Sequence, residues 1–191
     1  MTANYDFSAF PTLETPRLIL RELIADDDDA VYIIRSDIEV TRHNTGAPYT
    51  DIQQARTLIS DIAWNYKDQS EIRWGITLKT DPSWVIGMCG YNYWIRRDQR
   101  VSIGYDLARA YWDNGIMTEA LGAICRFGFE QMGLHRIEAD VSADNPASAR
   151  VLEKLGFKQE GRLREQYWEW GEFHDLLLYS LLRREFERGV P

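Results

Sequence analysis

The chain has 191 residues, of which 45% are hydrophobic, and a formal net charge of −8. A chain of this length can bury a substantial core without disulfides, and no apolar run is long enough to cross a bilayer. The acidic balance argues against a nucleic-acid partner, whose phosphates need a basic surface, and suits an amine-bearing partner better. We expect a single domain over residues 1–191, with its core from about residue 15 to about residue 185.

Other chemistries and locations are disfavoured by simple patterns. The first residues lack the basic and apolar segments of a secretion signal, which predicts a cytoplasmic protein without a membrane partner. Cys89 and Cys125 lie far apart and the histidines stand singly, so neither a disulfide nor a metal site is expected. The pattern does not distinguish a monomer from a homodimer.

In chain order, the first pattern is a strand at 17–23, where polar and apolar residues alternate. The acidic run from Asp26 to Asp29 follows and suits a helix N-terminus, which we interpret as facing solvent. Thr50 and Gln53 then form a predicted capping box. The helix after them carries apolar residues at helical spacing: Ile52, Ala55, Leu58, Ile59 and Ile62.

The second half of the chain predicts a mixed sheet. Runs of β-forming residues at 72–78, 84–95 and 100–108 indicate an antiparallel meander. A helix pattern at 116–132 separates the last of them from a strand at 135–142, and such a crossover requires a parallel pair. A helix capped by Asn145 and two strands around the turn at 168–173 complete an α/β fold of about seven strands.

The turn "WDNGIM", Trp112 to Met117, joins a strand to a helix through one glycine. A helix N-terminus presents unpaired N–H groups and a partial positive charge, which suit a pyrophosphate. A single glycine at such a turn is also common for backbone reasons alone. The turn by itself therefore leaves both interpretations open.

Three ordered motifs carry a family resemblance: "IGYDLARAYWDNGIMTEAL", "NPASARVLEKLGF" and "GEFHDLLLYSLL". Together they resemble the GNAT acetyltransferase superfamily, in its RimJ/RimL-like branch of ribosomal-protein N-acetyltransferases. The resemblance implies a GNAT fold with a splayed strand pair that receives acetyl-CoA as co-substrate, without a metal. The implied cofactor-binding residues are Tyr105, Asp106, Leu107, Trp112, Asp113, Asn114, Gly115, Ile116, Met117, Thr118, Asn145 and Ser148.

The chain departs from the family pattern at several positions. Trp112 stands where the turn pattern has a basic residue, and Met117 where it has a small one. Leu152 occupies the place of a tyrosine that supplies a proton in many relatives, and Ser102 the place of an acidic residue. We expect backbone amides to keep the cofactor site, whereas the identity of the base is left open.

The resemblance gives Ser148 and Glu138 as candidate catalytic residues. Ser148 would lie near the thioester sulfur, and Asn145 would bond the pantetheine arm, although both residue types also cap helices. Glu138 would take the proton of the amine through water. It alternates with apolar residues, however, and could equally lie on the solvent face of its strand.

For the acceptor, the resemblance points to the loop and the hairpin beside the cleft, with His43, Tyr49, Trp168 and Trp170 as candidate contacts. Most tryptophans would otherwise serve packing. The predicted activity is direct acetyl transfer to a primary amine, first a protein N-terminus. A small polyamine or drug-like amine is the alternative acceptor, and a non-catalytic acyl-CoA sensor is the alternative function.

Overall fold

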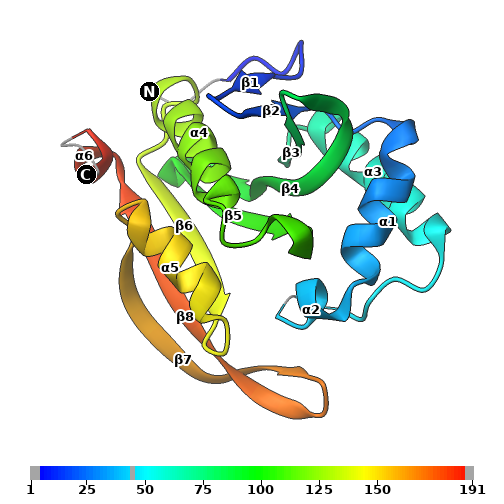
Figure 1. Ribbon diagram of the computed structural model, residues 1–191. Coiled ribbons are helices and arrows are strands. Elements are labelled where there is room, and N and C mark those ends of the chain that lie inside the picture. The colour runs from blue at the N-terminus through cyan, green and yellow to red at the C-terminus, as the bar shows by residue number, and fades with distance from the viewer. Residues whose placement is uncertain (1–4, 44–45, 188–191) are drawn as a thin grey trace.

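The computed structural model describes residues 5–43 and 46–187 (Figure 1). None of the helices within these ranges is long and apolar enough to cross a membrane. The helices are α1 (Asp28–Ser36), α2 (Ile38–Thr41), α3 (Ile52–Lys67), α4 (Ile116–Glu130), α5 (Pro146–Lys154) and α6 (Arg183–Phe186). The strands are β1 (Leu13–Glu14), β2 (Leu18–Arg21), β3 (Ile72–Leu78), β4 (Asp81–Ile95), β5 (Arg100–Leu107), β6 (Arg136–Ser142), β7 (Lys158–Glu169) and β8 (Glu172–Leu182).

The strands form one sheet in the order β1-β2-β3-β4-β5-β6-β8-β7. Every neighbouring pair is antiparallel except β5 and β6, which are parallel because α4 crosses between them. The predicted mixed α/β fold is confirmed, with eight strands in the described residues instead of about seven. The additional strand, β1, has only two residues, too few to show an alternating pattern.

Helices cover both faces of the sheet, and β4 contributes to both layers. Val85 and Met88 pack into a cluster with α1 and α3, whereas Ile86 and Cys89 pack into the larger cluster under α4 and α5. Val85 and Met88 share a face although they are three residues apart, because a β-bulge inserts one extra residue into β4 between the partners of Ile76 and Thr77 and so exchanges the two faces. Figure 1 shows α4 and α5 in front of the sheet, with α1 and α3 together on the right of the view and α2 below α1.

The parallel pair β5–β6 separates along its length. Its register runs only from Arg100↔Arg136 to Ser102↔Glu138, although β5 continues to Leu107. β6 meanwhile stays paired with β8 as far as Ser142. The end of β5 therefore has no β6 partner, and the predicted splay is confirmed.

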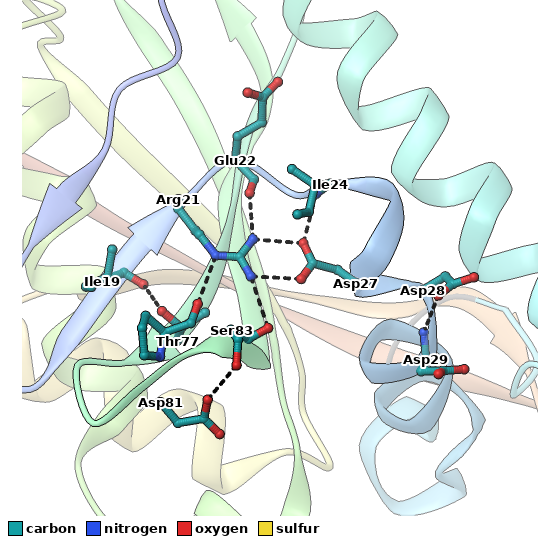
Figure 2. A network of polar contacts seen from close by, with 11 residues as sticks. Ile19, Arg21, Glu22, Ile24, Asp27, Asp28, Asp29, Thr77, Asp81 and Ser83 are labelled. Carbon is teal, nitrogen blue, oxygen red and sulfur yellow. Dashed lines mark hydrogen bonds and ion pairs between the residues drawn. The ribbon is translucent and has the colours of Figure 1, made fainter.

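The acidic start of α1 differs from the expected solvated cluster. Asp27 is 3% exposed, and its carboxylate receives two hydrogen bonds from Arg21, each 2.8 Å long. It also accepts from the amide of Ile24 (Figure 2). The interpretation of Asp26 to Asp29 as wholly solvent-facing was wrong for Asp27, because the last strand residue of β2 turns its guanidinium toward that carboxylate.

The cap of α3 lies one residue later than predicted. Asp51 is the N-cap, and its carboxylate accepts from the amide of Gln53 at 2.8 Å, while Gln54 completes the capping box. Thr50 lies outside the helix. Both Thr50 and Asp51 are good capping residues, so local preference alone did not separate the two registers.

Candidate active site

A cleft of about 550 Å³ opens where β5 and β6 separate. Its walls come from the end of β5, the first turn of α4, the α5 region and α2. All predicted cofactor residues except Asn114 line it: Tyr105, Asp106, Leu107, Trp112, Asp113, Gly115, Ile116, Met117, Thr118, Asn145 and Ser148. The tertiary structure thus gathers two of the three sequence motifs at one cleft, and "GEFHDLLLYSLL" contributes none of the lining residues. The binding role of each residue stays a prediction.

The first turn of α4 provides hydrogen-bond donors to the cleft. Gly115 is the N-cap with φ 71°, in the left-handed region, and no described side chain caps the helix. The first intrahelical bond is donated by Glu119 to the carbonyl of Gly115 at 3.0 Å. The amides of Ile116 to Thr118 therefore lack an intrahelical acceptor, and the positive end of a 15-residue helix faces the cleft.

Arg17, the residue directly before β2, holds this turn. Its guanidinium donates to the carbonyl of Asn114 at 2.9 Å and to Glu119 at 2.6 Å. Thr15 donates to the same carboxylate at 2.5 Å. The only carboxylate in the first turn of α4 is thereby paired, so it does not cancel the positive potential for an anion.

Tyr105 and Ser148 meet across the cleft. Their hydroxyl oxygens are 2.6 Å apart, and burial raises the pKa of Tyr105 to about 12, an effect that the bond to Ser148 opposes. The cap of α5 is the side chain of Asn145, which accepts from the backbone amide of Ser148 at 3.0 Å. The capping interpretation therefore applies to Asn145, whereas the hydroxyl of Ser148 contacts Tyr105.

Asp106, the next residue of β5, has a different environment. Its side chain is 8% exposed and forms an ion pair with Arg35 of α1 at 3.1 Å. The Nε of Arg35 is buried without a hydrogen-bond partner among the described residues. The guanidinium also lies 5.4 Å from the centre of the Tyr49 ring, so it is fixed from two sides.

The other end of the cleft is bounded by α2 and the loop after β6, with Glu39, Arg42, His43 and Asp144 in its wall. Burial, followed by the charge of Arg42, lowers the pKa of His43. Glu39 pairs with Arg42 at 3.0 Å. This end combines acidic and basic groups, and sequence patterns gave no signal for Glu39 or Asp144.

The β7–β8 hairpin closes against this end. The indole of Trp170 donates to the carbonyl of Arg42 at 3.2 Å, and the amide of Gly46 donates to Glu169 at 3.1 Å. The ring nitrogens of His174 face Asp144 and the carbonyl of Glu169, and these contacts raise the pKa of His174, Asp144 first. The hairpin and the α2 loop thus flank the cleft together.

Several predicted residues lie outside the cleft wall. Among the acceptor candidates, only His43 lines it. Tyr49 packs under Arg35, Trp170 contacts the α2 loop, and the ring of Trp168 lies 4.8 Å from that of Phe173. Local sequence could not separate these roles, because they depend on how far the hairpin reaches.

Glu138 also lies outside the cleft wall. Its carboxylate accepts from Arg100 at 2.7 Å and from Arg136 at 2.6 Å. Its neighbours Ile137 and Ala139 face the core on the opposite side of β6. The role of base that the resemblance gives to Glu138 stays a prediction, and these two ion pairs argue against it.

The structure adds two basic residues that the sequence interpretation missed. Arg150 and Lys154 line the cleft from α5. They are four residues apart, so they share a helix face, and this spacing was a signal that could have been used. They supply positive charge beyond the first turn of α4.

Comparisons with known proteins agree with this geometry. Residues 17–158 match the family described as the acetyltransferase (GNAT) domain. The chain belongs to the GNAT acetyltransferase family. This GNAT protein is 37% identical over 174 residues to the uncharacterized N-acetyltransferase YoaA of Bacillus subtilis, covering 91% of this chain and 98% of that one.

Two further similarities concern other members of the family. The chain is 27% identical over 110 residues to the ribosomal protein uS5 alanine N-acetyltransferase of Escherichia coli, covering 57% of each chain. The structure of Mycobacterium smegmatis RimJ in complex with CoA-disulfide has a TM-score of 0.77 and 25% identity, covering 92% of this chain and 87% of RimJ. The GNAT chain is thus an acyltransferase, and its acceptor is a separate question.

Proposed function

We propose that this GNAT enzyme transfers the acetyl group of acetyl-CoA to the α-amino group of a protein N-terminus by direct attack. The observation that carries the proposal is one continuous cleft. It runs from the donors of the α4 N-terminus, past Tyr105 and Ser148, to the wall formed by α2 and Asp144. Donor and acceptor can therefore meet in it without a covalent enzyme intermediate.

The residues present suit CoA. The uncapped first turn of α4 offers amides to a pyrophosphate, and Arg150 and Lys154 offer charge to further phosphates. The end of β5 offers backbone groups that β6 does not use. Acetyl-CoA supplies a thioester whose carbonyl carbon accepts the amine.

Ser148 is the proposed group at the departing sulfur. Its hydroxyl lies in the cleft wall, while the cap of its helix depends on Asn145. A hydrogen bond to sulfur becomes stronger as negative charge develops there, so it favours the transition state over the bound substrate. Replacing Ser148 with alanine should therefore lower kcat by about 10²-fold, within the range of general acid catalysis, with little effect on acetyl-CoA affinity.

The charge of the cleft supports an acceptor with a single positive charge. Four carboxylates line the cleft, and three of them are already paired: Asp106 with Arg35, Glu39 with Arg42 and Asp144 with His174. The fourth, Asp113, lies in the turn before α4, at the end proposed for the cofactor. A polyamine carries several charges and would gain most from free carboxylates. An N-terminal amine brings only one, and the name of the uS5 alanine N-acetyltransferase gives one relative a protein acceptor.

An N-terminal amine needs only a weak base to remove its proton at neutral pH. An α-amino group has a pKa near 8, so about a tenth of it is neutral at pH 7, whereas an alkyl amine with a pKa near 10 is almost fully protonated. Water, or the paired carboxylate of Asp106 in the cleft wall, is then sufficient. We place Asp106 ahead of Glu138 because only Asp106 lines the cleft.

The test is an acceptor panel with acetyl-CoA as donor: peptides that begin with Ser, Ala or Met, the same peptides with blocked N-termini, and spermidine. CoA release and acetylated product are both measured. We expect turnover on free N-termini and none on blocked ones. Faster turnover on spermidine would move the acceptor to polyamines, and binding of acetyl-CoA without turnover on any amine would favour a sensor.

A further inference from the structure

The contact between Tyr105 and Ser148 has a direction that matters for transfer. Tyr105 carries one hydroxyl hydrogen, and both of its polar contacts are on Ser148: Oγ at 2.6 Å and the carbonyl oxygen at 3.4 Å. Ser148 Oγ can accept that hydrogen and still donate its own. Only one hydrogen can lie between the two hydroxyl oxygens. If Tyr105 supplies that hydrogen, the hydroxyl hydrogen of Ser148 must point elsewhere.

Tyr105 has fewer alternatives as a donor than Ser148, because both acceptors that its hydroxyl contacts among the described residues lie on Ser148. Burial raises its pKa to about 12, so the phenol keeps its proton at any working pH. The ring packs against the core cluster under α4 and α5, which fixes the hydroxyl in place. Ser148 instead sits in the first turn of α5, in the cleft wall, with an open side toward the cleft.

We propose that Tyr105 is a positioning residue, which donates to Ser148 Oγ and thereby turns the hydrogen of Ser148 toward the thioester sulfur. The inference rests on the proposed function of Ser148. In the step itself, the amine nitrogen bonds the carbonyl carbon and the carbon–sulfur bond breaks with its electron pair on sulfur. The proton that nitrogen loses balances the one that sulfur gains, and Tyr105 keeps its own proton throughout.

The opposite direction gives the opposite result. If Ser148 donated to Tyr105, its hydrogen would be held away from sulfur, and removal of the phenol would free it. Tyr105→Phe would then leave kcat unchanged or raise it. The sign of the effect therefore distinguishes the two arrangements.

The experiment is a double-mutant cycle in the full chain, with acetyl-CoA and the best N-terminal peptide of the panel. We expect Tyr105→Phe to lower kcat about tenfold, the equivalent of one hydrogen bond of about 1.4 kcal/mol. The KM for acetyl-CoA should stay within about twofold, because the phenol acts only through Ser148. On the Ser148→Ala background, Tyr105→Phe should change kcat less than about twofold.

Tyr179→Phe is the matched control. Its hydroxyl also bonds residues of the α5 region and β7, Glu153 at 3.3 Å and Gln159 at 3.4 Å, but Tyr179 does not line the cleft. It should leave kcat unchanged. Melting temperatures and CoA affinities of all variants separate a packing loss from a loss at the sulfur.

The outcomes separate the inference from the function beneath it. An additive loss in the double variant, an unchanged kcat, or a faster Tyr105→Phe enzyme overturns the role of Tyr105 and leaves Ser148 in place. Full activity of Ser148→Ala overturns the role of Ser148, and the positioning role with it. Absence of transfer to any amine by the wild-type enzyme overturns the proposed function itself.

Discussion

Gly115→Ala tests whether the left-handed turn before α4 holds the pyrophosphate of CoA. An added Cβ meets only the guanidinium of Arg17 at 3.6 Å, an ordinary contact, so space is not the obstacle. The obstacle is the backbone, because φ is 71° and an L-residue with a side chain pays about 1–2 kcal/mol there. The substitution therefore isolates backbone conformation.

The expected change in the Kd for CoA depends on which part of the chain relaxes to relieve this backbone strain. Asp113, Asn114 and Gly115 are exposed, so the turn can relax locally while the sheet stays intact. A relaxed turn no longer aims the first amides of α4 into the cleft, and the apparent Kd rises by the inverse of the competent fraction. A strain of about 1–2 kcal/mol then raises the Kd for CoA about 5-fold to 30-fold.

Gly171→Ala provides the control. Gly171 lies in the β7–β8 turn with φ 84°, and nothing lies within 4 Å of an added Cβ. Both variants should lose about 2–8 °C in melting temperature, but only Gly115→Ala should lose CoA affinity in calorimetry at fixed salt. Unchanged CoA affinity in a folded Gly115→Ala protein would refute the assignment of this turn.

Three further predictions concern charged groups. Asp27→Ala should lower the free energy of unfolding in urea by about 3 kcal/mol, because it leaves the largely buried guanidinium of Arg21 without its carboxylate partner; a loss below about 1 kcal/mol would contradict that account. Glu138→Gln should lower the melting temperature through its lost arginine contacts while its pH–rate profile superimposes on that of wild type; a rise in rate shifted to higher pH would restore Glu138 as the base. Hydrogen bonds from Arg136, and then from Ser180, lower the pKa of Glu160 to about 2. The ionised carboxylate therefore contributes its full stabilisation of the fold above about pH 4.5 and loses it as the pH falls toward 2. The stability difference between wild type and Glu160→Gln should shrink over that window, and a difference that persists at pH 2 would exclude the mechanism.

Local sequence patterns were sufficient to predict those helices and strands whose own residues specify their structure. Strands β3 and β5, the crossover helix α4 and the Asn145 cap of α5 all appear where alternation, helical spacing and capping chemistry placed them. The parallel pair followed because a strand–helix–strand order requires a crossover. Local patterns were weaker at the Thr50–Asp51 cap, where two adjacent residues compete for the same role.

Sequence by itself therefore determined most of the elements and the mixed sheet, and through the resemblance it predicted that the turn around Gly115 holds the cofactor. Only the tertiary structure decided which side chains share the cleft, because those contacts join residues far apart in the chain. It placed the Ser148 hydroxyl on Tyr105 and Arg35 on Asp106, and it held Glu138 between two arginines. A strand has two faces, and its side chains point to them alternately. Which partner a side chain meets on its face depends on how other elements pack there, and not on its neighbours in the sequence.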